Sequence, residues 1–394
     1  MRQSSRPQLP LTTERGEHEH ARMLFAISDV LDDVPETCDL VRLDLNRATR
    51  AKTGRRGMTA EQVLRCLILK QMNGFTYDEL AFHIGDSRCY RHFCRFDFAE
   101  VTPKRSTLQR NLKLLRAETL EVVNDLLLKS ERVLKLEDGR KIRADSTVME
   151  TNIHAPADSA LLFDCVIVLS RLLGKARKRA SIEFQDHRQR AKRRRVGIEN
   201  ARTREDRRLL YKDLLLVTKQ TLTYAESAVK TLEELGEDAS VALQQKLAHF
   251  IKLTLRVVDQ TERRVLRNER VPSSEKIVSI FETHTDIIVK DRRETLYGHK
   301  LFITAGVSGL VELGVEEVAF SKGRGISVSQ MTSSRWLYRK LRNFRAGVES
   351  IISFLKRSFG MRRCTWRSLE SFKAYAWASI LSANLTLIAR ATLA

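Results

Sequence analysis

Hydrophobic and polar positions recur with a helical period over residues 58–136, and hydroxyl side chains mark where the helices begin. In three capping boxes a Thr or Ser is followed three residues later by Gln or Glu: Thr59-x-x-Gln62, Thr76-x-x-Glu79 and Ser106-x-x-Gln109. They predict helices over 59–73, 76–84 and 105–135. Helices of this length and spacing are typical of a helix-turn-helix-like DNA-binding module, and equally of a helical scaffold, so both interpretations stay open.

The first 57 residues are polar and charged, apart from a short apolar patch over 23–31, and we assign them no fold. From 157 to 271 there is no proline, and apolar residues recur on long charged stretches, for example at Leu209, Leu210, Leu214 and Leu215. This pattern predicts a long helical insertion or helical hairpin that ends at Pro272. A further apolar helix over 368–393 is expected to close the core.

Alternating apolar residues predict strands over 141–148, 297–305 and 317–321, the last two forming a hairpin. Asp145 stands out in the first strand because Asp is a poor strand former and its neighbours favour strands. An acid in such a strand is expected to have a chemical role, and an acid at a frayed edge or turn is the alternative. The fold class that these patterns predict is α+β and mostly helical.

A basic helix near the C-terminus carries a single acid. Arg345, Glu349 and Lys356 have the spacing R-x3-E-x6-K, which places them within roughly 40° of one another on a continuous helix. An apolar stripe of Val348, Ile351 and Leu355, preceded by Phe344, is expected to pack on the core. Between 322 and 367 there are twelve Lys or Arg and no other acid, which favours a metal ligand or salt-bridge hub at Glu349.

The charge of the chain indicates a polyanionic partner. Seventy Lys and Arg against 49 Asp and Glu give a formal net charge of +21, with many of the cations between 175 and 195. Nucleic acid is the expected partner because phosphate neutralisation supplies most non-specific affinity. An anionic membrane surface, a basic protein without a specific partner, or a solvated face at 175–195 are the alternatives.

The sequence disfavours membrane-spanning, disulfide-bonded and zinc-binding proteins. The longest apolar stretch, over 161–169, is too short to span a bilayer, so we expect a soluble intracellular protein with no membrane partner. Six cysteines without a CxxC pair favour a reducing compartment. The cluster His83, Cys89, His92 and Cys94 lacks paired zinc-ligand spacing, and buried helix residues are the preferred interpretation.

With Asp145 on a strand and Glu349 on a late helix, the chain resembles bacterial insertion-sequence transposases of the DDE class. In the branch it is most similar to, a Tyr-Arg-Glu-Lys signature surrounds the catalytic Glu; Arg345, Glu349 and Lys356 match it, and Arg342 stands where the Tyr would be. Residues 144–159, 288–306 and 344–385 resemble parts of the catalytic domain, and residues 58–95 resemble the N-terminal domain.

The resemblance implies four parts: a polar segment over 1–57, a helical DNA-binding domain over 58–136, a ribonuclease-H-like catalytic domain over 137–160 and 272–394, and a basic helical insertion over 161–271. It implies catalytic and metal-binding roles for Asp145 and Glu349 with Mg²⁺ (or Mn²⁺), and phosphate positioning by Arg345 and Lys356. The implied partners are the element's terminal repeats, target DNA and further copies of the chain in a synaptic complex, in a bacterial, nucleoid-associated cytoplasmic location.

The sequence departs from the family at one place. The family's second catalytic Asp follows the strand that resembles 297–305, but here Leu310 runs directly into VELGVEEVAFSK, which is similar to a region well downstream. Asp291 is the last aspartate of the chain. We therefore expect an internal deletion that leaves the catalytic domain incomplete and its activity impaired. Asp286, Asp291, Glu316 and Glu317 are poor substitutes because none stands at the matching position. The alternative function is a non-catalytic DNA-binding remnant.

Overall fold

The computed structural model describes residues 3–4, 18–47, 57–97, 99–130, 133, 143–235, 238–290, 294–305 and 335–394. The chain divides into two compact units, the first formed by 1–151 and 299–394 and the second by 152–298. Each is described by itself. The described residues are mostly helical, with one three-stranded sheet, as the α+β prediction requires.

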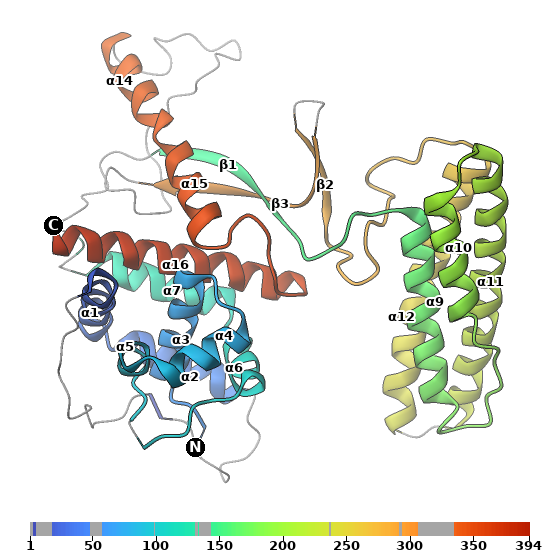
Figure 1. Cartoon of the computed structure of the whole chain (residues 1–394), viewed down its shortest axis with the longest axis horizontal. Coiled ribbons are helices and arrows are strands. Elements are labelled where there is room, and N and C mark those ends of the chain that lie inside the picture. The colour runs from blue at the N-terminus through green and yellow to red at the C-terminus, as the bar shows by residue number, and fades with distance from the viewer. Residues whose placement is uncertain are drawn as a thin grey trace. The chain divides into compact units, whose positions relative to one another are not determined.

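In the first unit, helices from the two ends of the chain share one core (Figure 1). Its helices are α1 (Glu19–Asp32), α2 (Glu36–Arg47), α3 (Ala60–Asn73), α4 (Tyr77–Asp86), α5 (Arg88–Phe93), α6 (Arg105–Leu112), α7 (Ala117–Leu128), α14 (Arg335–Ala346), α15 (Val348–Ser358) and α16 (Leu369–Leu393). The last helix, α16, is buried along nearly its whole length and packs on α1, α3 and α7. An apolar helix covered on most sides lies in the centre of a core, which confirms its predicted closing role.

Local capping chemistry explains two of the helix starts. The Thr59 and Thr76 hydroxyls each accept a hydrogen bond from the N–H three residues on, and the N–H of each Thr donates to the side-chain oxygen of Gln62 or Glu79. Both predicted capping boxes are confirmed. Helix α3 ends at Gly74, whose φ of +65° is the left-handed conformation that glycine adopts without steric cost.

The third capping box is wrong. Helix α6 begins at Arg105 with Lys104 as its N-cap, so Ser106 already lies inside the first turn and its side chain cannot cap. The predicted helix 105–135 is also interrupted, since α6 ends at Leu112 and α7 begins at Ala117. Residues 1–57, which we assigned no fold, contain α1 and α2, and both contribute side chains to the core.

The sheet has the order β1-β3-β2, with β1 (Arg143–Glu150), β2 (Asp286–Lys290) and β3 (Glu294–Ala305). The predicted strands 141–148 and 297–305 are confirmed as β1 and β3. A hairpin that the sequence did not predict is formed by β2 and β3, paired antiparallel from Asp286 opposite Gly298 to Lys290 opposite Glu294. The predicted strand 317–321 lies outside the described residues, and the ribonuclease-H-like fold stays a prediction.

The second unit contains a bundle of α9 (Asp158–Ala176), α10 (Arg188–Asn200), α11 (Arg204–Leu235) and α12 (Asp238–Thr261), which pack side by side (Figure 1). A short π-helix, η1 (Glu262–Leu266), continues α12. Leu214 and Leu215 are buried in the bundle core, while Leu209 is 59% exposed. The predicted helices of this segment are thus confirmed as a bundle within the unit 152–298, which also includes β2 and the start of β3. That the bundle is an insertion into a catalytic domain stays a prediction.

Candidate functional site

Asp145 lies on β1, the strand at which its chemical role was predicted. The Asp145 carboxylate is half-buried and accepts a hydrogen bond from the N–H of Ser146 over 2.7 Å. Met149, two alternations further along the same face, is fully buried in the first unit's core with Ile351 and Leu355 of α15. The strand that carries Asp145 is therefore packed against the helix that carries Glu349.

Glu349 lies in the first turn of α15, away from the buried stripe. Val348, Ile351 and Leu355 are buried as predicted, whereas Glu349 is exposed. Lys356, seven residues on, lies on the same side of the helix and is half-buried. The two elements of the predicted pair thus meet, while the Glu349 side chain itself faces away from the core.

The predicted continuous R-x3-E-x6-K helix is wrong in one respect. Helix α14 ends at Ala346 and α15 begins at Val348, so Arg345 is on one helix and Glu349 with Lys356 on the next. The interruption falls at Gly347, whose N–H bonds the carbonyl of Phe344 in a tighter turn than the α-helical one. Gly347 keeps right-handed helical backbone angles, φ −67° and ψ −13°, so the break is a local tightening of the turn.

Arg143, two residues before Asp145, contacts Phe344, which the sequence analysis did not predict. Its guanidinium lies over the Phe344 ring, 4.8 Å from the centroid, and Nη1 donates to the Phe344 carbonyl over 3.4 Å. A Cβ at Gly347 would collide with Nη1 of Arg143, so glycine permits this approach. A cation at a strand start gives no sequence signal of a partner about 200 residues away.

The described residues do not complete a metal site. They contain no group of three or more His, Cys, Asp or Glu side chains placed to hold a metal ion. A pair of Mg²⁺ ions requires several oxygen ligands in near-octahedral geometry, and Asp145 and Glu349 offer two carboxylates. Asp286 begins β2 in the second unit. Asp291, Glu316, Glu317 and the junction at Leu310 lie outside the described residues, and so does the Arg345 side chain.

The Arg and Lys side chains of the predicted basic run fall into two groups in the second unit. Some are ion-paired: Arg188 with Asp186, Arg190 and Arg194 with Asp213, and Arg195 with Glu199. The Asp213 carboxyl has its pKa lowered by hydrogen bonds from these arginines. Others are exposed and make no ion pair or hydrogen bond with any residue that the structure describes: Arg171, Lys175, Arg177, Lys178, Arg179, Lys192 and Arg193. We call these seven the unpaired cations; they lie at the end of α9, in the following loop and in the first turns of α10.

The four residues weighed as a zinc cluster are placed among aromatic rings and in the core. His83 stacks on Phe75 with centroids 4.4 Å apart, and the ring of His92 lies 5.4 Å from that of Phe25. Cys94 is fully buried, and all six cysteines of the chain are free thiols. His83, Cys89 and His92 are half-buried, so of these four residues the full burial that the sequence analysis preferred is observed for Cys94.

Comparison with known proteins gives one match. Residues 16–114 match the family model described as Transposase domain (DUF772). The match supports a transposase family. It begins just before α1 and ends just after α6, so the transposase domain includes the N-terminal helices that the sequence analysis left unassigned. No curated protein and no solved structure matches the chain. Among the described helices, none is long and apolar enough to cross a membrane.

Proposed function

We propose that this chain is an insertion-sequence transposase of the DDE class that retains DNA binding and is impaired in strand cleavage and transfer. The observation that carries the proposal is the transposase-domain match over 16–114, because that segment is independent of the residues around Asp145 and Glu349. The substrate class is DNA at the ends of the element, with target DNA as the second partner.

The second unit supports a DNA partner through the unpaired cations. Seven exposed Arg and Lys side chains that have no counter-ion among the described residues attract phosphate, since neutralising a phosphate releases condensed counterions. The paired arginines of α10 contribute less because carboxylates already offset their charge. We therefore place phosphate tracking on the unpaired cations, with Arg345 and Lys356 as the residues that position phosphate near Asp145.

Impaired cleavage follows from the small number of carboxylates that could hold the metal ions. In-line displacement at phosphorus by two metal ions uses more carboxylate ligands than Asp145 and Glu349 supply. The described residues add no third acid to them, and the sequence has no aspartate after Asp291. We attribute this shortage to the loss of a segment between Leu310 and Val311, a junction that lies outside the described residues.

A repair experiment tests this proposal. An Asp-bearing strand segment from an intact relative is inserted between Leu310 and Val311, and Mg²⁺-dependent nicking of DNA that carries the element's terminal repeats is compared before and after. Nicking only in the repaired protein supports the proposal. A repaired protein that is folded, as judged by thermal unfolding, and still does not nick would contradict the deletion account.

A non-catalytic DNA-binding remnant is the second candidate, and the incomplete donor set favours it. Such a protein would occupy the terminal repeats and compete with an active copy. Asp145→Ala separates the two candidates: the substitution abolishes any residual nicking of an enzyme and leaves the affinity of a pure binder for DNA unchanged.

A further inference from the structure

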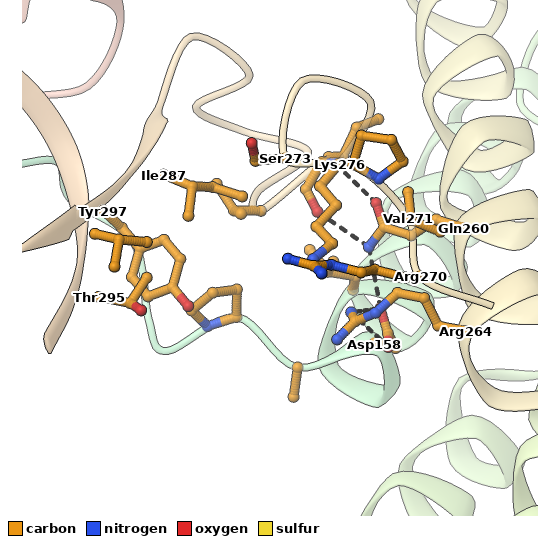
Figure 2. Close-up of a pocket in the computed structure, with 17 residues that line it drawn as sticks. Asp158, Gln260, Arg264, Arg270, Val271, Ser273, Lys276, Ile287, Thr295 and Tyr297 are labelled. Carbon is orange, nitrogen blue, oxygen red and sulfur yellow. Dashed lines mark hydrogen bonds and ion pairs between the residues drawn. The ribbon is translucent and has the colours of Figure 1, made fainter. Parts of the chain in front are cut away.

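One cavity of about 630 Å³ lies wholly in the second unit, at the N-terminal end of α9 (Figure 2). Its walls come from the start of α9, the end of α12 with η1, the loop over 270–278 and the β2–β3 hairpin. Pockets that bind small ligands have volumes of roughly 300 to 1,000 Å³. The size of this cavity is therefore that of a ligand site.

The cationic wall of the cavity has an excess of positive charge. Arg264 is held by Asp158, whose two carboxylate oxygens lie 2.9 and 2.8 Å from its Nη1. Arg270 and Lys276 also line the cavity and make no ion pair or hydrogen bond with any residue that the structure describes. Three cations against one carboxylate leave a formal charge of +2 on this wall.

A buried hydrogen-bond network fixes the position of the loop that carries Arg270 and Lys276. The Gln260 amide donates to Asp158 Oδ1 over 3.0 Å and accepts from the Ile277 N–H over 2.8 Å. Gln260 and Asp158 are both more than nine-tenths buried. This network ties the loop that carries Arg270 and Lys276 to the end of the bundle, so the two cations belong to an ordered wall.

The opposite wall is apolar and includes an aromatic ring. Ile287 and Val289 of β2 and the ring of Tyr297 of β3 line it, and Figure 2 shows the Arg270 side chain reaching from the bundle side towards them. An apolar and aromatic surface opposite two free cations suits a ligand with a flat apolar body and an anionic group. Bases stack on aromatic side chains, and Arg and Lys bind phosphate.

We propose that this cavity binds a nucleotide, with its phosphate on Arg270 and Lys276 and its base against Tyr297 and the β2 side chains. The nucleotide is either free or one unit of a DNA single strand. The site lies outside the residues that match the transposase domain, so the proposal does not rest on the function proposed above.

Calorimetric titration of the full chain with dAMP, with deoxyadenosine and with inorganic phosphate tests the proposal. We expect dAMP to bind about tenfold or more tightly than either fragment, because only dAMP engages both walls. The double variant Arg270→Ala/Lys276→Ala should weaken dAMP binding by at least about tenfold. The matched control Lys246→Ala/Lys252→Ala removes two exposed cations of α12 that do not line the cavity and should leave binding within about twofold.

Thermal unfolding shows whether the double variant folds; if it does not, Arg270→Glu replaces it, since Arg270 is exposed. Competition by a single-stranded oligonucleotide shows whether the site takes a free nucleotide or one unit of a DNA single strand. Displacement of dAMP from the wild-type protein by the oligonucleotide assigns the site to a DNA strand, and persistence of bound dAMP assigns it to a free nucleotide. No dAMP binding at millimolar concentration, or equal binding by wild type and folded variant, would overturn the proposal. Loss of DNA nicking or of duplex binding would leave it intact, so its failure is distinguishable from that of the proposed function.

Discussion

The Gln71 side-chain amide donates a hydrogen bond to the Ser379 hydroxyl over 2.9 Å, and both residues are buried. Gln71 lies on α3, inside the matched transposase domain, and Ser379 lies on the C-terminal helix α16. Residues of α16 belong to the same buried core as those of the matched segment, and this hydrogen bond joins positions 308 apart within that core. The last helix of the chain completes it.

The pairing of Asn124 with Asn384 gives the first prediction. Both are 2% exposed, and Nδ2 of Asn384 donates to Oδ1 of Asn124 over 2.8 Å. Asn384→Leu leaves a buried amide of Asn124 without this donor, which should lower the free energy of unfolding by about 1 to 3 kcal/mol. Urea denaturation measures it. The double variant Asn124→Leu/Asn384→Leu removes both polar groups and should recover part of the loss; equal stability of single and double variants would contradict the role of the pair.

Sequence predicted those elements whose signals are local. Thr59 and Thr76 mark helix starts because the capping partners are three residues away, and β1 was found from the residues around Asp145. The box at Ser106 failed because the N-cap lies two residues earlier than the hydroxyl suggests, at Lys104 after Pro103. Helices α1 and α2 were missed because their apolar residues are interspersed with many charges.

The candidate site residues came from the sequence, and their chemical roles stay predictions. Asp145 and Glu349 were chosen by type and neighbours, and the structure brings their elements together. The sequence did not predict the one-residue break at Gly347, nor the close approach of Arg143 from a distant strand that the missing side chain of Gly347 permits. The unpaired cations could not be separated from the paired ones, because Asp213 is on a different helix from Arg190 and Arg194.

Arg65 joins three segments of the matched domain and gives a second prediction. Its side chain is 2% exposed and pairs with Asp32 over 2.6 Å and with Glu61 over 3.0 Å. Arg65→Met should cost about 3 kcal/mol, the lower end for a buried pair that loses one partner, because Arg95 still contacts both carboxylates. In the control Arg42→Met, whose pair with Asp39 is exposed, the change should stay within about 0.5 kcal/mol. Equal losses in the two variants, by urea denaturation, would contradict the role of Arg65.

Lys70 gives a prediction for pH. It is 5% exposed, its Nζ lies 5.2 Å from the centroid of the Tyr77 ring, and burial lowers its pKa to about 8 from a usual 10.5. Between these values the unfolded chain holds the proton and the folded chain has released it. The unfolded state therefore binds more protons, and stability due to Lys70 should rise with pH through this window.

The comparison of wild type with Lys70→Met isolates this group from the thiols, whose raised pKa values act in the opposite direction above pH 9. We expect the difference in unfolding free energy between the two proteins to change by up to roughly 3 kcal/mol from pH 7.5 to 10.5, in favour of wild type at high pH. A difference that is flat with pH would show that Lys70 titrates normally.

The unpaired cations give a prediction for DNA binding. Neutralising Lys175, Lys178 and Arg193 to Gln should lower the slope of log affinity against log salt by about 2 to 3, since each lost phosphate contact removes about 0.9. Neutralising the paired arginines Arg188, Arg190 and Arg195 removes the same formal charge and should change the slope less. Fluorescence anisotropy with duplex DNA over a salt series measures both sets. Equal changes would mean that net charge, and not this segment, governs binding.

The most direct test of the central claim is Mg²⁺-dependent nicking of DNA that carries the element's terminal repeats, with binding to the same fragment measured in parallel. We predict binding, and nicking that is absent or far below that of the repaired protein, with DNA affinity unchanged in Asp145→Ala. Efficient nicking by the chain as it stands, abolished in both Asp145→Ala and Glu349→Ala, would mean that the carboxylate set is complete and would contradict the account.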